Sequence, residues 1–344
     1  MGLHTAIRVA VTALALSACL AGGAQAAEPE KSGKADQCRG VDMLAETKAR
    51  DPELFSKIMA QADTVRNGDA LLWKVERDGA PASYLFGTVH LTDERVTRLS
   101  PAVHQALKDS KTVALEVADL SEAATTKVIA KSAPLVIYKD GRRLDGLLTD
   151  SEYETVKKVI ARSGMPVDLA ASYKPWIVTM ILSVSDCERK KKQEGAKVLD
   201  MQIAEIGKAR GMDVVGLQSI PEQLKDEALV PEAQQLKMLR TSLKFADRTN
   251  DLMETLVQLY LNRKIAALLP FQIAIARQIG IGDDAYAAFQ TKRLIDRNIR
   301  MSNAAAPLLE KGGAFIAVGA LHLPGDKGLV SLLRSAGYTV TPIE

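Results

Sequence analysis

The chain has 344 residues, 47% of them hydrophobic and 25% charged, an ordinary composition for a globular protein with one large or two small domains. Its 45 basic and 42 acidic residues leave a formal net charge of +3. Because the two signs of charge are nearly balanced, the composition argues against nucleic acid or an anionic membrane surface as the partner.

The N-terminus has the pattern of an export signal. Arg8 precedes the apolar run Val9–Leu20, and Ala24–Ala26 forms an A-x-A cleavage site. The run is too short for a comfortable membrane span. We therefore predict a signal peptide over residues 1–26 and a periplasmic protein without a transmembrane span. Leu16–Cys19 also resembles a bacterial lipoprotein signal, which leaves lipidation of Cys19 open.

Export changes the interpretation of the cysteines. Cleavage after Ala26 leaves only Cys38 and Cys187, an even pair in an oxidising compartment. We predict a disulfide between them. The alternative is two buried free thiols.

The first half of the chain predicts helices followed by a hairpin. Residues 27–69 are expected to form a leader and helices, with a break at Asp51-Pro52, and residues 70–344 the main domain. A β-hairpin is predicted from 70–76 and 83–88, with its turn at Asp78-Gly79. A helix over 101–109 and a buried strand over 112–117 follow.

The remainder is mostly helical until the last segments. Helices are predicted over 121–137, from 148, over 169–189 with a kink at Pro175, over 198–210, through most of 222–310 and over 326–336. Strands are predicted over 213–217, 314–321 and 338–342. Because strands cluster at both ends, the pattern indicates an α/β core from discontinuous segments with a helical middle insert.

Two histidines share the frame Gly-x-x-His at the end of an apolar run. The frames are Gly87–His90 and Gly319–His322. A strand broken by glycine can deliver a side chain at its mouth, and glycine permits close backbone approach there. Paired imidazoles are typical of metal binding and acid–base chemistry. We interpret His104 as a surface residue.

Glu116 is a carboxylate in an otherwise apolar strand. An unpaired buried carboxylate is costly, so it should be ion-paired, metal-bound or protonated. With His90 and His322 it forms a set suited to a divalent metal. The same three residues could instead run metal-free acid–base hydrolysis, with histidine as base and Glu116 as its orienter. A structural ion pair with a helix arginine is the third interpretation.

A basic helix precedes the last core strand. Arg293 and Arg297 lie four residues apart, so one helical face could point both at a common anionic group. A solvated basic face explains them equally well. Asn298 is a further candidate beside them. Serine-hydrolase elbows, Walker loops, dinucleotide fingerprints and His-Glu-x-x-His helices are absent from the sequence.

Several ordered motifs resemble the TraB/GumN family, which is related to the TIKI metalloproteases and more remotely to erythromycin-esterase-like and ChaN-like haem-binding proteins. The resemblance runs from about Leu72 to the C-terminus. It is carried by Leu72–Val75, Tyr84–His90, Ala114–Val117, Lys174–Trp176, Val215–Leu224, Asp296–Asn298 and Val318–Gly325.

The resemblance implies a two-lobed α/β fold with a mixed sheet from the N- and C-terminal segments, in which both Gly-x-x-His motifs and the strand glutamate share one cleft. It assigns metal or acid–base roles to His90, Glu116 and His322, and strand-end roles to Gly87 and Gly319. Arg297 and Asn298 would support them. Many relatives carry Gly-Leu-Glu-Thr where this chain has Gly216–Ser219, so a role that needs a carboxylate at Gln218 is in doubt.

The leading functional hypothesis is an exported, metal-dependent hydrolase of the TIKI type that acts on a peptide or another small substrate. The cofactor would be a divalent ion such as Mn, Co or Zn. One alternative is a non-catalytic protein that binds haem, a metal or a glycan and is linked to polysaccharide production. Another is a metal-independent esterase.

Overall fold

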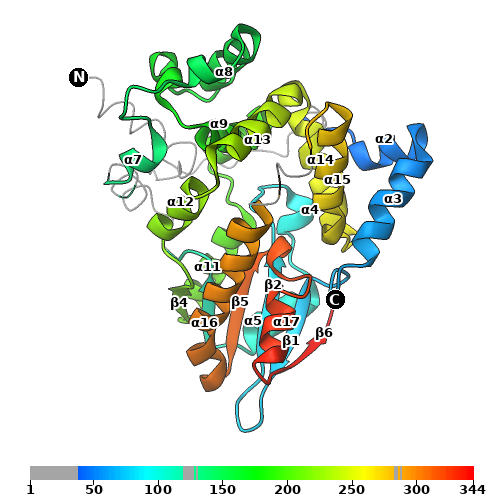
Figure 1. Cartoon of the computed structure of the whole chain (residues 1–344). Helices are drawn as coiled ribbons and strands as arrows, with labels where there is room; N and C mark the ends of the chain where they lie inside the picture. The colour runs from blue at the N-terminus through cyan, green and yellow to red at the C-terminus, as the bar shows by residue number, and fades with distance from the viewer. Residues whose placement is uncertain (1–37, 119–127, 129–130, 283–285, 287–288) are drawn as a thin grey trace, which may run out of the picture.

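A six-stranded sheet built from both ends of the chain organises the computed structural model, which describes residues 38–118, 128, 131–282, 286 and 289–344 (Figure 1). The strand order is β4-β3-β5-β2-β1-β6. The strands are β1 (Leu72–Glu76), β2 (Ser83–Thr88), β3 (Thr112–Leu115), β4 (Asp213–Gly216), β5 (Ala314–Gly319) and β6 (Thr339–Pro342). Strands β4, β3, β5 and β2 run parallel, whereas β1 pairs antiparallel with both β2 and β6. The sheet is therefore mixed, as the sequence predicts.

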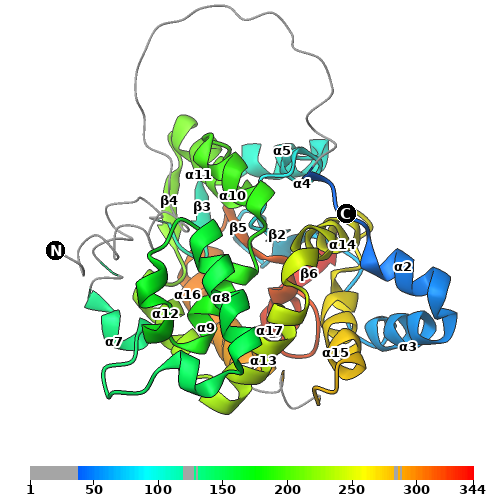
Figure 2. The same ribbon diagram turned by 90° about the horizontal axis from the view of Figure 1, so that it is seen from above.

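Helices cover both faces of this sheet (Figure 2). Alternate residues of each strand face opposite sides. Phe86 and Phe315 pack in one apolar cluster with α5 (Pro101–Lys108) and α11 (Leu199–Ala209). Their neighbours Leu85 and Ile316 pack in another with α16 (Asp296–Lys311) and α17 (Leu329–Ser335). The result is a three-layer α/β core that holds the strand ends in place.

The middle of the chain forms a separate helical lobe with its own apolar cluster, which lies above the sheet in Figure 1. Its elements are α7 (Ala133–Val136), η2 (Leu144–Leu147), α8 (Asp150–Arg162), η3 (Val167–Ser172), α9 (Pro175–Leu182), α10 (Asp186–Gln193), α12 (Ile220–Ala228), α13 (Glu232–Lys244) and η4 (Ala246–Arg248). The predicted two-lobed α/β class with a helical insert is confirmed.

One predicted helix of the insert is wrong. Residues 169–189 do not form a single helix kinked at Pro175, but divide into η3, α9 and α10. Pro175 occupies the first turn of α9, where its missing N–H has no intrahelical partner to lose. Ser185 then begins α10 by accepting a hydrogen bond from the Glu188 N–H. Proline and serine thus act as helix starts here.

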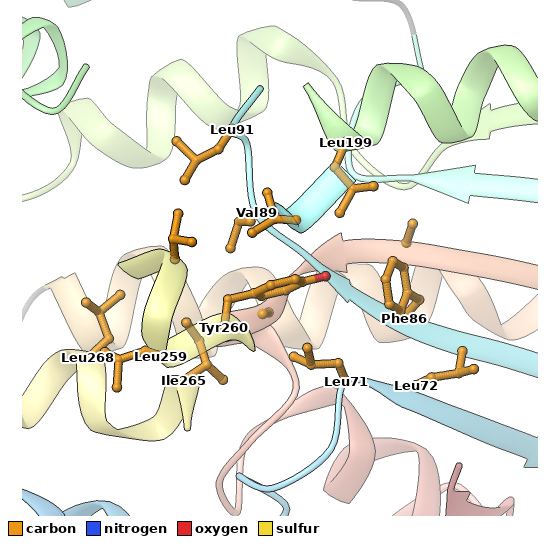
Figure 3. Packing of buried hydrophobic residues seen from close by; sticks show 14 of the residues in the cluster. Leu71, Leu72, Phe86, Val89, Leu91, Leu199, Leu259, Tyr260, Ile265 and Leu268 are labelled. Carbon is orange, nitrogen blue, oxygen red and sulfur yellow. The ribbon is translucent and has the colours of Figure 1, made fainter. Parts of the chain in front are cut away.

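The remaining helices belong neither to this lobe nor to the four helices that cover the sheet. They are α2 (Met43–Arg50), α3 (Pro52–Asp63), α4 (Glu94–Thr97), α14 (Thr249–Leu261), η5 (Ile265–Ala267), α15 (Leu268–Gln278), the π-helix η7 (Phe289–Ile295) and the short η8 (Ala320–His322). Asp51 separates α2 from α3 and caps α3, which confirms the predicted break. Figure 3 shows Tyr260 of α14 packed among Val89, Leu259 and Ile265.

A disulfide joins Cys38 to Cys187, 149 positions apart, with a Cα–Cα distance of 5.5 Å. The predicted pairing is confirmed, and it ties the start of the described chain to α10. The predicted signal peptide, with Cys19, lies outside the described residues, as does most of the predicted helix over 121–137. Within the part of the chain that the structure describes, no helix is long and apolar enough to cross a membrane.

Candidate functional site

Three neighbouring parallel strands end at one edge of the sheet, and each is followed by a candidate residue. His90 lies two positions beyond β2, Glu116 directly follows β3, and His322 closes η8 after β5. The order β3-β5-β2 makes these strands neighbours. Carboxyl ends of parallel strands open on one side, which is where ligands bind in such sheets. The sequence predicted a strand over 112–117, but β3 ends at Leu115, so Glu116 lies just past it.

The Glu116 carboxylate is buried and receives donors on both oxygens. Arg297 Nη2 lies 2.5 Å from Oε2, and the Gly319 N–H donates to Oε1 at 2.7 Å. Burial alone would raise the pKa of Glu116, but the neighbouring His322 and the Arg297 guanidinium lower it to about 2. These donors and the low pKa favour the ionised carboxylate at neutral pH over the protonated form.

Both frame glycines lie where a side chain would crowd its neighbours. A Cβ at Gly87 would lie 2.7 Å from Leu323 Cδ1 and 3.0 Å from the Ala320 Cα. A Cβ at Gly319 would lie 3.1 Å from Glu116 Oε1. The first glycine lets the two strand ends approach each other, and the second lets a backbone N–H reach the carboxylate. The Gly87 carbonyl also accepts a hydrogen bond from the Tyr260 hydroxyl at 2.8 Å.

His322 is a buried, neutral imidazole in one defined tautomer. Asn298 Nδ2 donates to the Lys327 carbonyl, so Asn298 Oδ1 faces His322 Nδ1 at 2.6 Å. Oδ1 therefore accepts a hydrogen bond from the Nδ1–H group of His322. Burial lowers the pKa of His322 to about 4, against the opposing pull of Glu116. The unprotonated Nε2 then faces Glu116 Oε1 at 3.6 Å. This position excludes Glu116 as the residue that orients His322 through Nδ1.

The Nδ1 side of the His90 ring is held by a buried carboxylate of α11. Its Nδ1 lies 2.8 Å from Asp200 Oδ2, and Thr88 donates to Asp200 Oδ1 at 2.7 Å. Asp200 raises the pKa of His90, although water around the exposed 60% of the His90 side chain weakens that attraction. The remaining nitrogen, Nε2, is left for a ligand or substrate.

Sequence reasoning missed Asp200 and a second carboxylate, Glu188. Buried Glu188 accepts from the N–H and hydroxyl of Thr92, which steadies the segment after His90, and it adjoins the disulfide residue Cys187. A signal for Asp200 was available, because it lies next to Leu199 and three positions before Ile203 on the buried face of a helix. A carboxylate at such a position must have a partner.

The predicted metal set can be compared with these contacts. Both imidazoles direct Nδ1 at an oxygen acceptor and leave Nε2 unprotonated when neutral, as in many metal-binding histidines. The 3.6 Å between His322 Nε2 and Glu116 Oε1 resembles the ~3.4 Å between two ligands of one tetrahedral ion. Within the described ranges, however, no three His, Cys, Asp or Glu side chains are grouped closely enough to hold a metal. The donor chemistry fits a metal, whereas the grouping of all three residues is not observed.

The sequence profile of the TraB/PrgY/gumN family matches residues 71–342. The chain belongs to this family. Two relatives are the zebrafish (Danio rerio) proteins named metalloprotease TIKI2 and metalloprotease TIKI1, each 24% identical. Those matches cover 85% and 79% of this chain and 64% and 63% of the relatives, so the chain spans just under two thirds of their length. No solved structure matches.

The sequence of this TraB/PrgY/gumN chain allowed Arg293 and Arg297 to bind one common anion. In the structure they contact different groups. Arg297 Nε donates to Gln218 Oε1 at 3.0 Å while Nη2 contacts Glu116, whereas Arg293 pairs with Glu227. Gln218 is buried, and its Nε2 has no hydrogen-bond partner among the described residues. Arg297 therefore forms an ion pair with Glu116 and a hydrogen bond with the neutral Gln218. His104 is exposed, as predicted.

Proposed function

We propose that the protein is an exported hydrolase that uses a divalent metal ion to cleave peptide bonds. One observation carries the proposal: the lone pair of His322 Nε2 faces an ionised carboxylate oxygen at 3.6 Å. Two electron-rich atoms at this distance repel unless a cation lies between them. The names of the TIKI relatives, which describe metalloproteases, support the same class of reaction.

The chain's own residues would divide the work. Nε2 of His90 and His322 and Oε1 of Glu116 would hold the ion, with the two ends of the site drawn together on binding. A bound divalent ion lowers the pKa of a water and polarises a carbonyl. Arg297 keeps Glu116 ionised, and Asn298 and Asp200 fix the histidine tautomers. The exposed side of His90 would receive the substrate.

Export rests on two features. The predicted signal peptide over residues 1–26 directs the chain out of the cytoplasm, and the Cys38–Cys187 disulfide belongs in an oxidising compartment. We propose a periplasmic location, either as a free protein or anchored through lipidated Cys19. Mass spectrometry of the mature N-terminus distinguishes these forms.

The test combines metal analysis with hydrolysis. Purified mature protein is assayed for bound metal by mass spectrometry and for cleavage of a peptide library, before and after chelation and on return of Mn, Co or Zn. We expect activity that is lost on chelation and restored by one of the ions. His104→Ala is the matched control, because it removes an exposed histidine outside the site.

Three results would contradict the proposal in distinguishable ways. Hydrolysis of esters that is unaffected by chelation would assign a metal-independent esterase. Visible absorbance on haem titration, lost in His90→Ala and without any turnover, would assign a binding protein. Metal-free protein that cleaves nothing with any added ion would exclude the metal-dependent hydrolase.

A further inference from the structure

A second site lies in the helical lobe, away from the sheet edge. A cavity of about 150 Å³ opens between α8, α9, α10 and the start of α14. None of its lining residues belongs to the sheet-edge site. Val159 and Ile181 give it an apolar wall, while Arg189 and Asn250 supply polar atoms. A volume of this order holds a ligand of roughly six heavy atoms.

Arg189 lines this cavity with unused donors. Its side chain is only 10% exposed, and its Nη2 donates to the Val184 carbonyl at 3.1 Å and to Asp186 Oδ1 at 2.9 Å. Nε and Nη1 are buried and have no hydrogen-bond partner among the described residues. Buried guanidinium N–H groups are normally satisfied, so two unused ones on a side chain that lines a cavity point to an acceptor that binds beside them.

Asn250 lines the same cavity with an unused acceptor. Its Oδ1 is buried and likewise lacks a partner within the described part of the chain. Asp186 pairs with Arg189 at 2.9 Å and with Arg162 at 3.6 Å. Arg162 and Asp247 both line the cavity as exposed residues, and their opposite charges offset each other. The buried wall therefore offers guanidinium donors and one amide acceptor, which suits a carboxylate that also carries a hydrogen-bond donor.

We propose that this cavity binds a short α-hydroxy or α-amino carboxylate. The carboxylate would accept from Nε or Nη1 of Arg189, and the hydroxyl or ammonium group would donate to Asn250 Oδ1. Val159 and Ile181 would contact a short aliphatic side chain. Charge-assisted bonds from a partly desolvated arginine are strong enough to select a carboxylate. The proposal does not depend on the hydrolase assignment, because binding is measured without turnover.

Calorimetric titration of the chelator-treated, disulfide-intact protein tests it with lactate, alanine and propionate. Lactate and alanine should bind at least about tenfold more tightly than propionate, which has the carboxylate but lacks the donor. Asn250→Leu should abolish that preference. Arg189→Gln should weaken all three ligands by about tenfold or more. Arg142→Gln, which removes an exposed arginine, should change nothing.

Circular dichroism checks that each variant is folded, and Asn250→Leu decides the question if Arg189→Gln does not fold. Equal binding of lactate and propionate to the wild type, or no binding of either, would overturn the proposal and leave a cavity filled by water. A preference for lactate that persists in Asn250→Leu would also overturn it. Loss of binding in His322→Ala would assign the ligand to the sheet edge instead.

Discussion

The two histidines of the sheet edge have opposite surroundings. His322 is 5% exposed and held between Asn298 and Glu116, whereas 60% of the His90 side chain is exposed and its carboxylate partner lies behind it. Burial keeps the first ring neutral, and an ion pair favours the charged form of the second. The shared Gly-x-x-His frame therefore gives the sheet edge a closed side at His322 and an open side at His90.

The largest expected effect is on the closed side. His322→Ala should lower kcat/KM for the substrate found in the library by about a thousandfold or more, because it removes one of the side chains proposed to hold the metal ion. His104→Ala should leave it unchanged. Turnover within a few-fold of wild type in His322→Ala would remove this residue from the mechanism.

Arg297 tests whether the closed side depends on its ion pair. Arg297→Gln leaves buried Glu116 without its guanidinium and should lower the free energy of unfolding by about 3–5 kcal/mol. Lys57→Gln, which breaks an exposed ion pair with Glu53, should leave the free energy of unfolding nearly unchanged. Urea denaturation measures both. Equal losses in the two variants would show that burial of the Arg297 pair has no special role.

The disulfide should matter to the open side. Replacing Cys38 and Cys187 together by serine should lower the free energy of unfolding by about 2–5 kcal/mol, because the bond closes a long loop. The Thr92 N–H donates to Glu188, which lies in α10 beside Cys187. Hydrogen exchange of this N–H should therefore accelerate when the disulfide is removed. The Gly319 N–H should serve as the control. If exchange at the Thr92 and Gly319 amides accelerates equally, the disulfide has no specific effect on the segment after His90.

Asp200 tests how far the open side is positioned from behind. Asp200→Asn keeps the size of the side chain but loses the carboxylate that orients His90, so metal affinity or kcat/KM should fall about 10–100-fold. The matched control is Asp226→Asn, which removes a buried carboxylate that pairs with Arg300 instead of a histidine. Unchanged metal affinity and kcat/KM in Asp200→Asn would show that His90 needs no positioning from α11.

The smallest effects are on the pH dependence of stability in metal-free protein. The pKa of His322 is about 4 when folded and about 6.5 when unfolded. The unfolded state therefore binds the extra proton between these values, and stability falls as pH drops below about 6.5. The ion pair with Asp200 raises the folded pKa of His90 above its unfolded value of about 6.5, so its contribution is present below about 6.5 and is lost as pH rises through the raised pKa.

Thermal unfolding across pH separates the two limbs. His322→Gln should flatten the acid limb, and His90→Gln the alkaline limb. A profile in which either variant flattens the other limb would reverse the assignment of the two histidines.

Much of the fold was predictable because its signals are local. The hairpin before His90, the break at Asp51 and the single strand before Glu116 follow from apolar alternation and capping residues. The prediction over 169–189 failed because Pro175 and Ser185 can each start a helix or interrupt one. Local pattern does not distinguish these roles when the flanking residues are uniformly apolar.

By itself the sequence determined which side chains emerge at the sheet edge, since the two Gly-x-x-His frames and Glu116 mark where apolar strands end. It also determined the cysteine pair. Only the tertiary structure decided the partners: Asp200 for His90, Asn298 for His322, and Arg297 rather than Arg293 for Glu116. Partners of buried polar groups are set by which distant elements pack together, and the periodicity of a single segment carries no record of that packing.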